Sequence, residues 1–242
     1  MRGRLPCGGR PLTRVSRPLL RHDDQVSVLP LVFTSGWASG INAYAVVLLL
    51  GVFGRTGLTD DVPASLQRTD VLIVAAVLFL CEAVADKVPY VDSIWDALHT
   101  VIRPLAGAVI GALLAGQSGS LSDIAAGAVG GSTALASHFV KAGTRMAINT
   151  SPEPFTNVGM SLAEDLGVAG IVTFAMFNPQ VAAIIAAVLL ALGLATLVFL
   201  WARIRRFLRR RAQRREERHL AAEARESAGP GAATGTGPAP PR

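Results

Sequence analysis

The chain alternates long apolar runs with short polar breaks. Six apolar runs extend over about 27–54, 71–88, 93–116, 121–141, 152–177 and 180–202. A helix of about 20 apolar residues is long enough to cross the hydrocarbon core of a bilayer. The pattern therefore predicts an all-α, polytopic membrane protein with about six transmembrane helices between residues 27 and 202.

The first predicted helix is interrupted by small and polar residues. Gly36 and Gly40 are four residues apart, a spacing that lets two membrane helices pack closely. Asn42 follows them, and its amide needs a hydrogen-bond partner inside the membrane. Two interpretations remain open: a broken helix whose backbone lines a cavity, and an unbroken helix with a tight glycine-rich interface.

The third predicted helix contains Pro104, which predicts a kink. Its apolar part, 105–116, is too short to cross a bilayer alone, but the run becomes long enough when it is counted from Ser93. Because Pro89 ends the preceding helix, Asp92 or Ser93 is expected to cap the new one. A re-entrant hairpin is the alternative for this segment.

Charged side chains gather where the apolar runs end. Glu82 and Asp86 share one helix face, and Lys141 and Arg145 share another. An unpaired charge near hydrocarbon costs several kcal/mol, so we expect the two acids to meet the two cations. Further partners are expected from the neighbouring runs. The full set of candidate substrate- or ion-binding residues is Asn42, Glu82, Asp86, Asp96, His99, Arg103, His138, Lys141, Arg145, Glu164 and Asp165.

The two ends of the chain are basic, whereas only 17% of all residues are charged. A soluble domain has roughly 25% charged residues. Residues 1–26 form a basic tail that we expect to be disordered, 203–226 an arginine-rich helix, and 227–242 a disordered tail rich in glycine, proline and alanine. Because arginines near membrane helices stay on the inner side, both termini are expected in the cytoplasm of a multi-pass protein of the cell membrane.

The arginines also suggest partners. The formal net charge is +6, and most of this excess lies in the two tails. We expect the segment Arg203–Arg218 to contact anionic lipid headgroups in the bilayer, and we do not expect nucleic-acid binding. A homo-oligomer is compatible with the small residues that line several of the helices.

Several kinds of chemistry find no support in the sequence. Cys7 and Cys81 form neither a disulfide framework nor a metal-binding pattern. A metal site from Glu82, Asp86 and the two histidines His99 and His138 is not favoured, and no metal or cofactor is predicted. Among common catalytic motifs, Gly-x-Ser-x-Gly, His-Glu-x-x-His and the Walker pattern are absent from the sequence.

Three separated motifs look familiar when they are taken together. They are SGINAY at 39–44, the region 82–103 with ADKVPYVD at 85–92, and KAGTR at 141–145 running to SPEP at 151–154. In this order they resemble a family of membrane proteins catalogued as domain of unknown function 4126, over about residues 30–178. The resemblance implies an integral membrane protein and no particular activity.

Three functions remain in competition. Acids at membrane depth and a broken first helix favour a transporter or channel for a small solute or ion, with a charged site in the cytoplasmic half of the membrane. In a membrane scaffold, the charges would only pair with one another. In an enzyme that acts on lipids or their headgroups, His99 or His138 would be the base and Arg103, Lys141 and Arg145 the clamps. The enzyme is the least favoured of the three.

Overall fold

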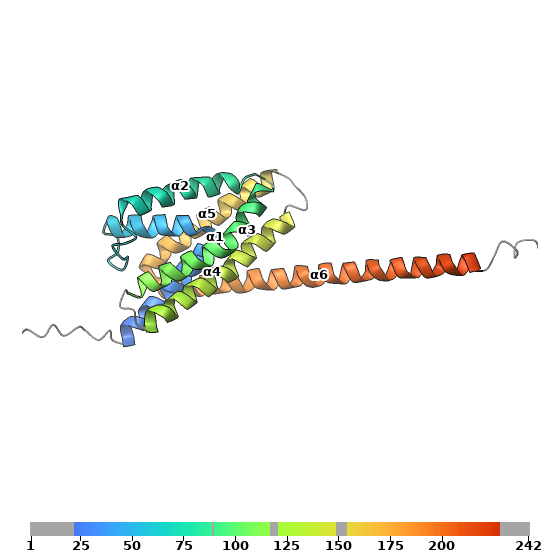
Figure 1. The fold of residues 1–242 in the computed structure, drawn as a ribbon. Coiled ribbons are helices and arrows are strands. Elements are labelled where there is room, and N and C mark those ends of the chain that lie inside the picture. Colours follow the sequence, from blue (N-terminus) through green and yellow to red (C-terminus); the bar gives the residue numbers. More distant parts are fainter. Residues whose placement is uncertain (1–21, 89, 117–120, 149–153, 228–242) are drawn as a thin grey trace, which may run out of the picture. The chain divides into compact units, whose positions relative to one another are not determined.

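The computed structural model describes residues 22–88, 90–116, 121–148 and 154–227. Within these residues every regular element of secondary structure is an α-helix, as the apolar pattern predicts. The six helices are α1 (His22–Arg55), α2 (Thr69–Ala85), α3 (Val91–Leu114), α4 (Leu121–Ile148), α5 (Pro154–Phe177) and α6 (Pro179–Ser227), as Figure 1 shows. The chain divides into two compact units, Met1–Ala187 and Val188–Arg242, which we describe separately.

In the part of the chain that the structure describes, four segments are long and apolar enough to cross a membrane. By length and composition these are Val28–Arg55, Val91–Leu114, Phe155–Phe177 and Pro179–Ala221. Many large apolar side chains on the surface of the first unit are exposed, among them Ile73 on α2, Leu105 on α3 and Leu166 on α5. Such a surface is unstable in water and suits a lipid environment. The prediction of a helical, multi-pass membrane protein is confirmed.

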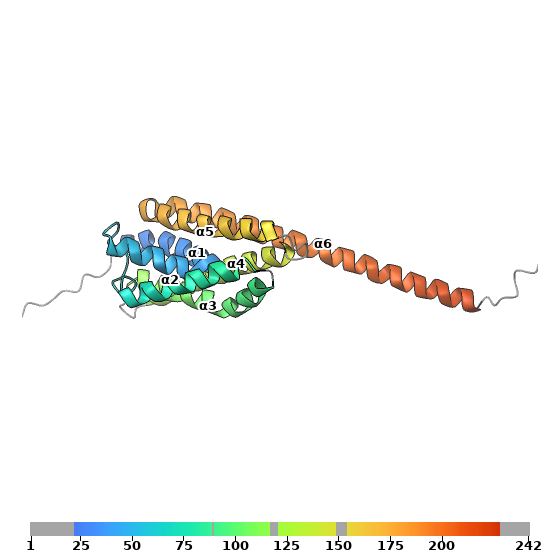
Figure 2. The same ribbon diagram turned by 90° about the horizontal axis from the view of Figure 1, so that it is seen from above.

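Helix α1 is broken at Asn42, where the backbone leaves helical geometry with φ −149° and ψ 95°. The two halves run in opposite directions and lie along different helices (Figures 1 and 2). Before the break, Gly36 lies against Gly130 of α4. After the break, the chain runs back along α2, and Arg55 Nη1 donates a hydrogen bond of 2.9 Å to Thr69 Oγ1 at the start of α2. The single crossing expected over 27–54 is therefore a helical hairpin.

The glycine spacing in α1 also has the packing role that the sequence suggested. A methyl group added at Gly40 would collide with the Ser137 side chain and the Ala134 carbonyl of α4. On α3, a methyl group added at Gly107 would likewise collide with the backbone of Gly130. The helix is thus broken, as the first interpretation expected, and the glycines of its first half pack closely on α4, as the second expected.

The third helix begins earlier than the sequence indicates. Its N-cap is Tyr90, with a positive φ of 72° and no capping bond from the side chain, so the expected cap at Asp92 or Ser93 is wrong. Asp92 instead lies in the first turn, where the helix dipole favours an anion. Pro104 lies inside a helix of 24 residues, which is long enough to cross a bilayer.

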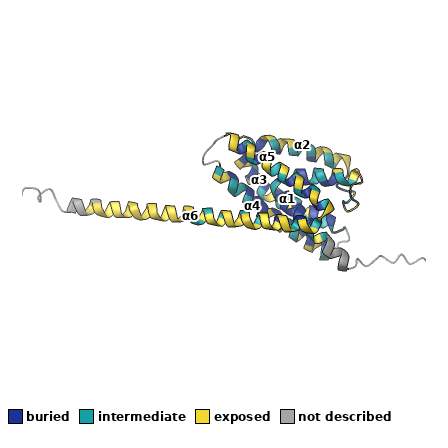
Figure 3. Cartoon of the chain, turned by 180° about the vertical axis from the view of Figure 1, so that it is seen from behind, coloured by how far each residue is buried: buried dark blue, intermediate teal, exposed yellow. Residues whose placement is uncertain are grey.

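The other helix boundaries follow the sequence more closely. The expected start of the fifth helix at 151–152 lies outside the described residues, and α5 is helical from Pro154. Asn178 precedes the start of α6 as expected, and its carbonyl accepts a bond of 3.0 Å from the Ala182 amide. Helix α6 continues without interruption for 49 residues. Most of its side chains are exposed, as the yellow colour in Figure 3 shows.

Candidate functional site

Four helices of the first unit bring ionisable side chains together. The end of α2 supplies two acids, the first turns of α3 supply two acids and an arginine, and the last turns of α4 supply two cations. Helix α5 adds an acid three turns from its start. We call this set the buried ion network, and it consists of Glu82, Asp86, Asp92, Asp96, Arg103, Lys141, Arg145 and Glu164.

Arg103 connects three helices within the network. Its Nη2 donates to Glu82 Oε1 on α2 at 2.8 Å, and its Nη1 donates to Asp96 Oδ1 at 3.0 Å. The same Nη1 donates to Nδ1 of His138 on α4 at 2.7 Å. The arginine side chain has no solvent-exposed surface. Both terminal nitrogens of this buried cation thus donate to acceptors, whereas its Nε has no hydrogen-bond partner.

Lys141 and Arg145 connect α4 with α2 and α5. Lys141 Nζ lies 2.8 Å from Asp86 Oδ2 and 3.3 Å from Glu82 Oε1. Arg145 Nη2 donates to Asp86 Oδ2 at 3.0 Å and to Glu164 Oε2 at 2.7 Å. The expectation that the acids of α2 meet the cations of α4 is confirmed. The arginine partner of Glu82 is Arg103, however, and not Arg145.

The break in α1 is part of the same arrangement. The Asn42 side-chain oxygen accepts the Ala45 amide proton at 2.9 Å, so Asn42 caps the second half of the helix. This cap occupies the amide that would otherwise bond to the Ile41 carbonyl in a continuous helix. The Ile41 carbonyl instead accepts a bond of 2.9 Å from Lys141 Nζ. The Asn42 amide nitrogen donates to Asp165 Oδ1 of α5 at 3.0 Å.

The two histidines are held by protein partners on both ring nitrogens. Because a guanidinium can only donate, Nδ1 of His138 accepts from Arg103 and its Nε2 faces Thr100 Oγ1 at 3.1 Å. In His99, Nδ1 lies 2.7 Å from the Trp95 carbonyl and Nε2 lies 2.9 Å from the Tyr44 hydroxyl. This arrangement positions two rings but leaves neither with a nitrogen directed at a separate ligand.

The network contains more acids than cations. In the part of the chain that the structure describes, five carboxylates lie within 3.9 Å of Arg103, Lys141 or Arg145. Three carboxylate oxygens in the network have no hydrogen-bond partner, one each on Glu82, Asp86 and Asp96. Glu164 is the most accessible of the network's paired carboxylates, with 13% of its side chain exposed.

A polar stripe on α5 carries further unused hydrogen-bonding groups. Asn157 and Ser161 lie eight and four residues before Asp165, and therefore on the same face of the helix. Both are buried, and the amide of Asn157 and the hydroxyl of Ser161 have no hydrogen-bond partner. On α1, the buried hydroxyl of Ser39, one turn before Asn42, is also unpartnered. Native proteins rarely leave such groups unsatisfied without a reason.

Every candidate residue from the sequence lies in or beside this site, but several contributors were not predicted. Asp92, Tyr44 and the polar stripe of Asn157 and Ser161 are the side chains that the sequence analysis missed. The spacing of Asn157, Ser161 and Asp165 was a usable signal, because these polar residues repeat with a helical period in an apolar run. No signal in the sequence indicated that the carbonyl of Ile41 would lose its helical hydrogen bond and accept one from Lys141.

The site shows no arrangement for a metal. Within the described residues, no three histidine, cysteine or acidic side chains converge in a way that could hold a metal ion. Cys81 is a free, exposed thiol on α2. The arrangement is therefore one of ion pairs, a broken helix and unpartnered polar groups.

Comparison with known proteins places the chain in a family. No curated protein and no solved structure matches the chain significantly. A family model described as a domain of unknown function matches residues 29–199, which extends beyond the resemblance seen in the motifs and includes the apolar part of α6. The chain therefore belongs to the family DUF4126, a domain of unknown function.

Proposed function

We propose that the protein is a transporter or channel for a small ion or solute, with its site at the break of α1. The observation that carries this proposal is a set of unpartnered polar groups on the two helices that meet at the break: the hydroxyl of Ser39 on α1, and the amide of Asn157 and the hydroxyl of Ser161 on the face of α5 whose Asp165 accepts from Asn42. Burying such groups without partners costs about 1–3 kcal/mol each, so we expect them to bind water or a ligand. A bound solute or ion would supply the missing partners.

The broken helix supports the same proposal. In membrane proteins, non-helical backbone at membrane depth is tolerated where it lines a cavity or is buried in protein. Discontinuous helices present backbone groups and helix ends to substrates and coupling ions. Here Asn42 starts one half-helix, and the carbonyl of Ile41 ends the other next to Lys141. Glu164, as the partly exposed carboxylate, is the point at which we expect exchange with solution.

A scaffold remains the second candidate, because eight charged side chains pair with one another across four helices. Lipid or headgroup chemistry finds less support. A general base needs a ring nitrogen that is free to face its substrate. In His99 and in His138, both ring nitrogens contact protein groups.

We also propose that the protein lies in the cell membrane with the arginine-rich end of α6 in the cytoplasm. The expectation that both tails share this side assumed one crossing by the first helix. Because α1 turns back at Asn42, its two ends lie at the same end of the helical unit (Figure 1). If the first helix does not cross the membrane, the six helices no longer imply an even number of membrane crossings.

The experiment is a flux measurement on purified protein in sealed proteoliposomes. Gradients of H⁺, Na⁺, K⁺ and Cl⁻ and a set of labelled small solutes are applied in turn, and phospholipid turnover is followed in the same vesicles. Glu164→Gln removes the charge at the expected entry point. Ser132→Ala is the control, since Ser132 is exposed and its hydroxyl bonds only to a carbonyl of its own helix.

We expect a protein-dependent flux that Glu164→Gln reduces at least tenfold while Ser132→Ala retains it. Folded protein without flux of any of these probes would favour the scaffold, and lipid turnover without flux would favour the enzyme. Either result would overturn the proposal.

A further inference from the structure

The second unit contains a helix surface that the proposed transport site does not use. Between 203 and 218, helix α6 carries nine arginines and only two glutamates. None of these arginines forms an ion pair with an acid in the described residues. Acids among the described residues therefore do not balance this surplus of cations.

The arginines do not all have the same surroundings. The guanidinium of Arg205 lies 4.8 Å from the ring centre of Trp201, and that of Arg211 lies 4.6 Å from the ring centre of Phe207. These two arginines are held on aromatic faces by cation–π contacts. Arg203, Arg206 and Arg210 follow one another at spacings of three and four residues, and therefore form a stripe on one face.

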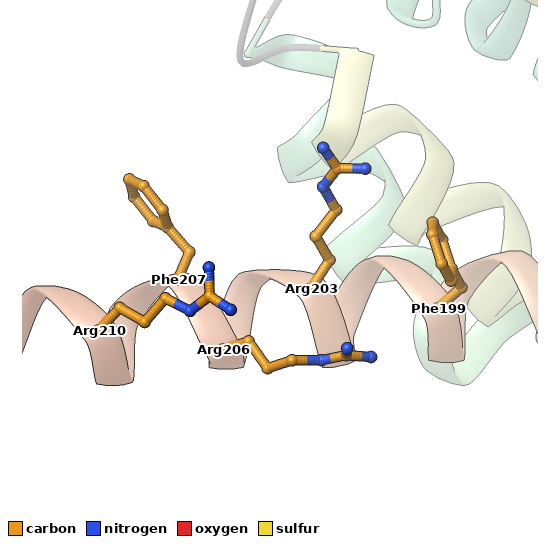
Figure 4. A pocket seen from close by; sticks show the side chains of 5 residues that line it. All are labelled: Phe199, Arg203, Arg206, Phe207 and Arg210. Atoms are coloured by element: carbon orange, nitrogen blue, oxygen red, sulfur yellow. The ribbon is translucent and has the colours of Figure 1, made fainter.

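This stripe lines a recess on the helix surface. Phe199, Arg203, Arg206, Phe207 and Arg210 surround a volume of about 370 Å³. Figure 4 shows the side chains of Arg206 and Arg210 extending along the helix towards Phe199, that is, towards the apolar part of α6. The guanidinium groups are thereby displaced towards the region where a membrane-crossing helix meets lipid headgroups. Two phenylalanine rings bound the recess and supply an apolar rim.

We propose that this arginine stripe binds the phosphate of anionic phospholipid headgroups at the membrane surface. Guanidinium groups match phosphate oxygens in bidentate geometry, and several on one face hold a phosphate better than one. Phe199 and Phe207 enter the outer part of the acyl region next to the bound headgroup. The occupant is a lipid because the stripe begins two residues after Trp201, an aromatic residue of the type enriched at the membrane interface.

Nucleic acid is the competing class of anion, since phosphate contacts dominate its binding as well. The apolar helix that leads directly into the stripe argues against it. Large apolar side chains of α6 such as Val198, Phe199 and Trp201 are exposed and have to lie in lipid. The arginines that follow are therefore held at headgroup height whenever α6 is inserted.

The test uses the full-length protein in bilayers of phosphatidylcholine with a minor fraction of phosphatidylglycerol. Spin-labelled phosphatidylglycerol and spin-labelled phosphatidylcholine report which lipid is immobilised by the protein. The stripe variant changes Arg203, Arg206 and Arg210 to Gln. The control variant changes Arg205, Arg209 and Arg215 to Gln, which removes the same charge from the other faces of the helix.

We expect the wild type to select phosphatidylglycerol over phosphatidylcholine several-fold. The stripe variant should lose this selectivity, and the control variant should keep most of it. Equal loss of lipid selectivity in both variants would show a diffuse charge effect and overturn the arginine stripe as the binding site. Displacement of the labelled lipid by millimolar inorganic phosphate or by an RNA oligonucleotide, with tight RNA retention, would overturn the lipid as occupant. The result is independent of flux, so it is separable from the transport proposal.

Discussion

Replacing Arg103 with Met tests whether the buried ion network stabilises the fold. The change removes the donors to Glu82 at 2.8 Å, Asp96 at 3.0 Å and His138 at 2.7 Å, and it leaves two buried carboxylates without that cation. Removing one partner of a buried ion pair typically costs 3–5 kcal/mol. Because the Arg103 side chain is fully buried, solvent screening does not reduce this value. The loss is a large part of the 5–15 kcal/mol that stabilises a typical protein.

The measurement is the unfolding of the purified protein in mixed micelles, followed by tryptophan fluorescence. Glu82→Gln in the same chain removes one of the two carboxylate charges left without Arg103. The loss of unfolding free energy in the double variant should therefore be about 1–3 kcal/mol smaller than the sum of the losses in the two single variants. Arg68→Met is the matched control, because the Arg68–Asp70 pair is exposed on both sides and its loss should not shift the transition. An unchanged midpoint for Arg103→Met, or strict additivity in the double variant, would refute the pairing.

Three further predictions concern α1. Asn42→Ala should destabilise the protein by about 1 kcal/mol through loss of the cap, whereas Asn42→Ser should keep most of the stability in the same unfolding assay; equal losses would argue against capping. Gly40→Ala should strongly reduce the yield of monodisperse protein because of the collision with α4, while Gly170→Ala, where no atom lies within 4 Å, should not; a normal yield for both would contradict the close packing. Reporters fused before residue 28 and after Phe53 should report the same side of the membrane, and opposite sides would exclude the hairpin.

The membrane class, the helix order and all members of the network except Asp92 could be predicted because they depend on local composition. The spacing of Glu82 and Asp86 defines a helix face, and membrane insertion makes unpaired charge costly enough to require a partner. Which cation meets which acid could not be predicted. Glu82 pairs with Arg103 because α3 returns next to α2, and that choice depends on helix placement across the bundle.

The direction of α1 could not be predicted either. Its apolar composition over 27–54 suits one crossing, and a single residue in extended geometry changes the path of the chain. Asn42 can adopt that geometry, since its side chain caps the next helix and Asp165 accepts its amide. The cap at Tyr90 was missed for a related reason, because a positive φ at a non-glycine residue has no signal in the sequence.

The most direct test of the proposed site is whether water reaches the polar stripe of α5. Cysteine is introduced at Ser161 or at Val172 in a chain whose native cysteines are changed to Ser, and a water-soluble maleimide is applied to the protein in lipid bilayers. Both positions are buried, with exposed fractions of 0% and 1%, and they lie on the same face of one helix. We predict that the thiol at 161 reacts at least tenfold faster than the thiol at 172. Equal, negligible labelling at both positions would contradict a solute-accessible site at the α1 break.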